Sequence, residues 1–129
     1  MTEYVVWLDS NEAHIFALKS SGIEKSNLKK AGAKHHTNNK KDHHGADPAT
    51  EHFYSDLGAK LKSASQILIL GPGLAKTHFK THLEKHHSDV VKKIVAVENS
   101  DHPTDHQVLA TARNFFKSYN LYNQPVRSE

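Results

Sequence analysis

Three histidines recur at every fourth position between residues 78 and 86, a spacing that suits metal binding. His78, His82 and His86 would lie along one face of a helix, where two imidazoles can converge on zinc. No glutamate follows the first histidine as in His-Glu-x-x-His, so a zinc protease of that type is excluded. Three neighbouring lysines would oppose a cation: Lys76, Lys80 and Lys85. We therefore favour exposed helix residues and no cofactor, and keep a histidine-rich metal-binding or metal-dependent hydrolytic protein as the alternative.

A second polar set lies between residues 25 and 44. Residues 31–48 read AGAKHHTNNKKDHHGADP and contain no apolar residue larger than alanine, so we expect a mobile basic loop. Lysines neutralise the phosphates of an RNA backbone, and histidines beside phosphate become cationic more easily. No aromatic side chain is present there for base stacking. The predicted RNA-binding residues are Lys25, Lys29, Lys30, Lys34, His35, His36, Lys40, Lys41, His43 and His44.

A third candidate is the turn after the apolar run QILIL at residues 66–70. Such a run is typical of a strand buried on both faces. It is followed by Gly71-Pro72-Gly73 and then by a helical pattern. Free N–H groups at the start of a helix can bind an anion, which makes Gly71, Gly73 and Lys76 a candidate anion-binding turn. The spacing of a phosphate-binding loop is absent, and we favour glycines that simply permit a tight connection.

Carboxylates at strand ends raise one more alternative, a two-metal nuclease. The acids in question are Asp9, Glu98 and Asp101, with Glu3 and Glu12 nearby. We favour ordinary solvated side chains, because nothing in the sequence groups these acids together.

The composition restricts the class of protein. A chain of 129 residues suffices for one domain with a real core. It has no cysteine, which excludes disulfides, thiol catalysis and thiolate metal sites. No signal peptide or long apolar run is visible, so we expect a cytoplasmic protein with no membrane partner. Its net charge of +3 and its twelve histidines suit a polyanionic partner.

The elements that would position these residues follow from hydrophobic periodicity and turn signals. Three short strands with tight turns between them suggest an antiparallel meander, the last one polar and at an edge. A helix should begin at Pro48 with Asp47 as its N-cap, and the final ten residues should form a frayed tail. The expected strands are 4–8, 12–19, 23–30, 66–70 and 92–98, and the expected helices are 49–62, 75–87 and one after residues 101–105. The order predicts a single α/β domain: a mixed β-sheet, with parallel strands from β-α-β units added to the meander and helices packed on it.

Two segments carry a resemblance to a known family. Residues 69–79 read ILGPGLAKTHF and residues 101–107 read DHPTDHQ. Together with the element order, they resemble the central domain of archaeal and eukaryotic class-1 release factors and of Pelota, and its stand-alone bacterial relatives of the translational-machinery type. The first segment is similar to the family's Gly-Pro-Gly-Phe-Thr-Lys-x-x-Phe turn, with the lysine offset by one residue.

The resemblance implies a release-factor central-domain-like fold and a role in translation. In release factors the loop before the first helix carries a Gly-Gly-Gln that positions water for ester hydrolysis, whereas Pelota lacks it. Here the loop reads KKDHHGADP over residues 40–48, with one glycine and no glutamine. We therefore predict a non-catalytic protein that contacts RNA or the ribosome. A module that pairs with a second copy through residues 23–30 or through the last helix is a third hypothesis.

Overall fold

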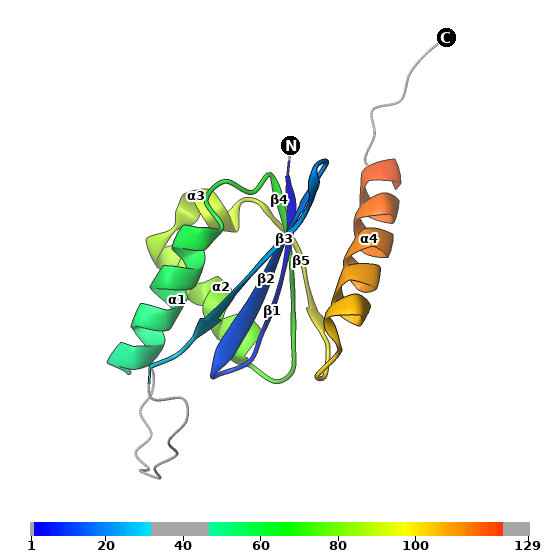
Figure 1. Ribbon diagram of the computed structural model, residues 1–129. Coiled ribbons are helices and arrows are strands. Elements are labelled where there is room, and N and C mark those ends of the chain that lie inside the picture. The colour runs from blue at the N-terminus through cyan, green and yellow to red at the C-terminus, as the bar shows by residue number, and fades with distance from the viewer. Residues whose placement is uncertain (1, 32–46, 123–129) are drawn as a thin grey trace.

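The computed structural model describes residues 2–31 and 47–122. Five strands form one mixed sheet in the order β3-β2-β1-β4-β5 (Figure 1). The pairs β1–β2 and β2–β3 are antiparallel, while β1–β4 and β4–β5 are parallel. The strands are β1 (Glu3–Leu8), β2 (Glu12–Lys19), β3 (Gly22–Lys29), β4 (Gln66–Gly71) and β5 (Ile94–Asn99).

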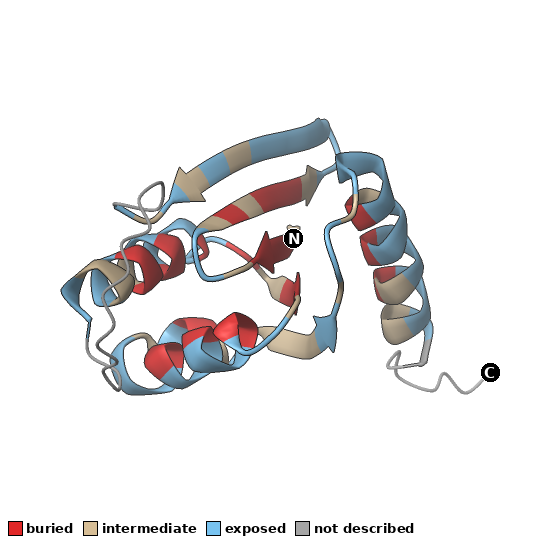
Figure 2. Cartoon of the chain, turned by 90° about the horizontal axis from the view of Figure 1, so that it is seen from below, coloured by how far each residue is buried: buried red, intermediate tan, exposed pale blue. Residues whose placement is uncertain are grey.

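Helices cover both faces of this sheet. On one face lie α1 (Pro48–Lys60), α2 (Ala75–His86) and the short α3 (Ser88–Val91). On the other lies α4 (Asp105–Tyr122) alone (Figure 1). The strands β1 and β4 are therefore buried on both sides, and alternate side chains enter two separate cores. Val6 and Ile69 pack beneath α1 and α2, whereas Val5 and Leu68 pack beneath α4. Figure 2 shows the buried residues concentrated on the inward faces of the helices and in the central strands.

The predicted α/β class, the mixed sheet and the edge position of the third strand are confirmed. Two local features differ from the expectation. A one-turn helix, α3, separates α2 from β5, which begins at Ile94 rather than at residue 92. The helix α4 includes residues 120–122, which were expected in the frayed tail, because Asn120 is held by Glu3 and Gln66 at 3.0 Å each. The remaining tail residues, 123–129, lie outside the described residues.

Strand direction brings several loops to one edge of the sheet. Since β3, β1, β4 and β5 all run the same way, their carboxyl ends meet at that edge. The β1–β2 turn, the Gly71-Pro72-Gly73 turn and the loop before α4 are gathered there. In open α/β sheets the crevice outside the carboxyl ends of the strands is the usual ligand site. No helix of the described residues is both long and apolar enough to span a membrane.

Candidate functional site

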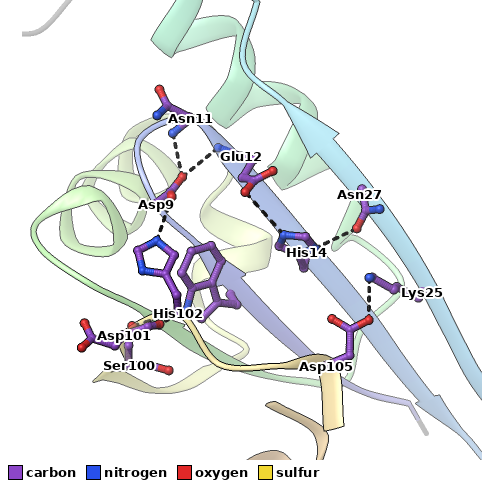
Figure 3. Close-up of polar contacts among 11 residues, drawn as sticks. Asp9, Asn11, Glu12, His14, Lys25, Asn27, Ser100, Asp101, His102 and Asp105 are labelled. Carbon is purple, nitrogen blue, oxygen red and sulfur yellow. Dashed lines mark hydrogen bonds and ion pairs between the residues drawn. The ribbon is translucent and has the colours of Figure 1, made fainter. Parts of the chain in front are cut away.

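A pocket of about 240 Å³ opens at this edge, between the β1–β2 hairpin and the start of α4. Its centre is Trp7, near the carboxyl end of β1, with a side chain that is 4% exposed. Figure 3 shows polar side chains from the β1–β2 hairpin, from β3 and from residues 100–105 lying close together at this edge. The lining residues are Trp7, Glu12, His14, His102, Pro103, Thr104, Asp105 and Val108.

Trp7 ties the loop before α4 to the sheet. Its indole N–H donates to the carbonyl of Asp101 at 2.9 Å and, more weakly, to that of Ser100 at 3.3 Å. The rings of His14 and His102 lie against the indole, with centroids at 5.7 and 5.1 Å. The pocket therefore has an aromatic floor and two imidazoles at its rim.

Carboxylates dominate the charge around the pocket (Figure 3). Asp9 accepts the backbone N–H groups of Asn11 and Glu12 at 2.8 and 2.9 Å, which closes the β1–β2 turn. Its other oxygen lies 3.6 Å from the His102 ring. Glu12 lies 3.8 Å from the ring of His14. Two of the lining residues, Glu12 and Asp105, are acidic, and negative charge of this kind opposes the binding of a phosphate.

One predicted RNA-binding residue, Lys25, lies beside the pocket, where it contacts the lining residue Asp105. Its ammonium forms an ion pair with Asp105 at 2.6 Å and lies over the ring of Phe16, 5.6 Å from its centroid. The lysine is therefore engaged within the fold, where it joins the edge strand β3 to the first turn of α4.

The other described residues of the basic set lie on opposite faces, because side chains alternate along a strand. Lys29 is exposed at the end of β3. Lys30 lies toward α1, 3.3 Å from the hydroxyl of Thr50 and 3.8 Å from Asp47. The hydrogen bond from Thr50 and the charge of Lys30 together lower the pKa of Asp47, the predicted N-cap. Seven predicted contacts lie outside the described residues: Lys34, His35, His36, Lys40, Lys41, His43 and His44.

The predicted anion-binding turn has a structural explanation. A Cβ atom at Gly71 would overlap the carbonyl oxygen of Leu8, so the close approach of β1 and β4 requires glycine there. Gly73 adopts a left-handed φ of 62°. Lys76 is buried, and its ammonium donates to the carbonyl of Gly73 at 2.5 Å. This lysine therefore closes the turn itself, and its role toward an anion remains a prediction.

The three candidate metal-binding histidines separate in the structure. His82 is 7% exposed and shares a 3.2 Å hydrogen bond with the hydroxyl of Ser55 on α1. The ring of His86, one turn further along α2, lies against that of His82 in a tilted arrangement, with a centroid distance of 4.6 Å. Their nitrogens and a carboxylate oxygen of Glu51 lie within 4.8 Å of one another, and His78 is not in this group. Burial, reinforced by the neighbouring His86, lowers the pKa of His82, so its neutral form is favoured.

Sequence reasoning did not find Glu51 or Ser55, because they lie in a different helix and share no spacing signal with the histidines of α2. It also did not find the pocket around Trp7, whose lining comes from three separate parts of the chain. The acids considered for a two-metal nuclease do not form a metal-binding group among the residues the structure describes, since such a group is found only at Glu51, His82 and His86.

Comparison with known proteins gives structural matches only. No family model matches the chain, and no curated protein matches its sequence. Its structure is similar to Pelota from Archaeoglobus fulgidus, with 17% identity and a TM-score of 0.61 over 88% of this chain and 31% of that one. It is also similar to the archaeal translation termination factor aRF1, with 13% identity and a TM-score of 0.55 over 94% of this chain and 40% of that one.

A third match is Dom34 of S. cerevisiae, described as a translation termination-like factor involved in RNA quality control pathways and interacting with Hbs1. Here identity is 14% and the TM-score 0.58, over 94% of this chain and 34% of that one. The chain thus spans about a third of the length of the proteins it resembles. These matches confirm the predicted release-factor central-domain-like fold.

Proposed function

We propose that this protein is a component of the translation machinery that binds RNA or the ribosome without hydrolysing peptidyl-tRNA. The observation that supports the proposal most is the fold, which nearly the whole chain shares with a translation termination factor and with a termination-like factor of RNA quality control. We further propose that the 129 residues act as one domain and that the protein works in the cytoplasm.

The contact region in this proposal is the basic segment between β3 and α1. Its two ends are held close together at the strand-end edge: the backbone N–H of Lys30 donates to the carbonyl of Asn11 at 2.8 Å, and the side chain of Lys30 reaches Asp47 and Thr50. The intervening sequence carries three lysines and four histidines and a single acid, Asp42. Such an excess of cationic donors favours a phosphate backbone.

The absence of hydrolysis is proposed from the residues of the chain itself. Release factors use a Gly-Gly-Gln, and no two adjacent glycines occur anywhere in this sequence. By that resemblance the protein recognises its target without the ester-cleaving group. A mixture with peptidyl-tRNA-loaded ribosomes should therefore show binding with no release of the peptide above the uncatalysed rate.

The test is co-sedimentation of the full chain with ribosomes, and separately with free RNA, at low and high salt. The double variant Lys40→Ala/Lys41→Ala should lose most of the low-salt binding, since each phosphate contact contributes to a salt-dependent affinity. Arg113→Ala/Lys117→Ala is the matched control, because it removes the same charge from exposed positions of α4. Equal loss in both variants would show a nonspecific charge effect. No binding of the wild-type chain at low salt would overturn the proposal.

A further inference from the structure

We infer that Glu51, His82 and His86 form a binding site for a divalent transition-metal ion of the zinc class between α1 and α2. One ligand atom from each residue lies within 4.8 Å of the other two, and the Nδ1 of His82 is 3.7 Å from a carboxylate oxygen of Glu51. The site lies on the face of the sheet covered by α1, α2 and α3. It is separate from the pocket around Trp7 and from the basic segment of the proposed function.

The donor set has the chemistry that such an ion selects. Two imidazoles and one carboxylate are a common three-ligand combination for zinc, which leaves a fourth position for water. For metal–ligand bonds of about 2.0–2.1 Å, tetrahedral ligand atoms lie about 3.3 Å apart. Closure by up to about 1.5 Å therefore completes the site, and the two ligands that must move are exposed: Glu51, whose side chain is 52% exposed, and His86.

The central ligand is already oriented. His82 is held between the Tyr54 ring, at a centroid distance of 5.6 Å, and the ring of His86. The hydroxyl of Ser55 lies 3.2 Å from Nε2 of His82, which leaves Nδ1 on the side of Glu51. A partner on the second nitrogen of a ligating histidine commonly sets its tautomer and ring orientation. Ser55 is thus a positioning residue in this site.

Charge around the cluster is compatible with a cation. Lys76, which the spacing had placed against a metal, turns instead to the carbonyl of Gly73 at the other end of α2. Lys85 is exposed to solvent, where its repulsion is screened. His82 and His86 lie near the C-terminal end of α2, where the helix dipole favours positive charge.

The experiment is a calorimetric titration of the full chain with zinc chloride. Because His35, His36, His43 and His44 could bind zinc on their own, the titration is done in a chain in which all four are replaced by glutamine. One zinc per chain is expected. Cobalt titrated in its place should give visible absorption bands of a low-symmetry site with nitrogen and oxygen ligands.

Four substitutions in this background locate the ion. His86→Gln and Glu51→Gln should each weaken zinc binding at least tenfold, and both positions are exposed, so the fold should be retained, as circular dichroism can verify. His78→Gln is the matched control on the same helix and should leave the affinity unchanged. Ser55→Ala should weaken binding by about 10-fold or more through the orientation of His82. The proposal is overturned if the background chain binds no zinc, or if His78→Gln weakens binding as much as His86→Gln does.

Discussion

Gly71 is the position where a single methyl group should have the largest effect on stability. A Cβ atom there would lie 3.2 Å from the carbonyl carbon of Leu8 and overlap the attached oxygen. The obstacle is backbone in a central strand, so it cannot rotate away as a side chain would. Relief requires that β1 and β4 separate at the carboxyl end of their pairing, where Trp7 faces Leu70. Gly71→Ala should therefore lower the free energy of unfolding by about 3 kcal/mol or more, the cost of overpacking that displaces backbone.

Gly73 provides the matched substitution two residues away. An added Cβ there meets nothing within 4 Å, and the only cost is the left-handed φ of 62°, about 1 kcal/mol for a residue with a side chain. Urea unfolding followed by circular dichroism should therefore rank wild type, Gly73→Ala and Gly71→Ala in order of falling stability. In thermal melts the two variants should lose about 4 °C and about 12 °C for a domain of this size. A Gly71→Ala protein as stable as Gly73→Ala would refute the steric argument.

Two further predictions concern Trp7 and His82. Trp7→Phe should lower the free energy of unfolding by about 1–2 kcal/mol, because the carbonyls of Ser100 and Asp101 lose the indole donor. The control Tyr4→Phe removes an exposed hydrogen bond to Ser63 and should change the urea midpoint little. Equal effects of the two substitutions would contradict this prediction. Burial holds the folded-state pKa of His82 below its ordinary 6.5. The unfolded chain therefore binds more protons than the folded chain as the solution becomes acidic. The contribution of neutral His82 to the free energy of unfolding is complete above pH 6.5 and is lost as pH falls below it. In metal-free buffer the free energy of unfolding should fall more steeply from pH 7 to pH 5 in the wild type than in His82→Gln, and identical slopes would show that His82 is not buried as a neutral ring.

Much of the fold was predictable because the local signals agree with one another. The apolar run at residues 66–70 indicated a strand buried on both faces, and β4, like β1, contributes alternate side chains to the cores on both sides of the sheet. The polar sequence of residues 23–30 indicated an edge, where one side of a strand meets solvent. The predicted helix start was also right, with Pro48 as the first residue of α1 and Asp47 at the N-cap position. The short helix α3 was not predictable, because four residues carry too little periodicity.

The candidate sites were less predictable than the fold. The histidine spacing on α2 correctly suggested a shared helix, but it could not show that His82 turns inward against α1 while His78 stays outside the cluster. Likewise, Lys29 is exposed while the next residue, Lys30, contacts α1. Lys25 is held by Asp105, which is eighty residues away in the sequence. Contacts of this kind depend on which helix packs against which strand.

Local sequence is enough to indicate the class of fold, the burial of residues 66–70 on both faces and the glycine turn after them, because these features depend on residues close together in the chain. Which polar side chains come into contact depends on how the helices and strands pack together. The pocket around Trp7 and the group Glu51–His82–His86 each join residues from separate elements. Their chemistry arises when hydrophobic packing of the helices on the sheet fixes the distances between groups that no sequence pattern connects.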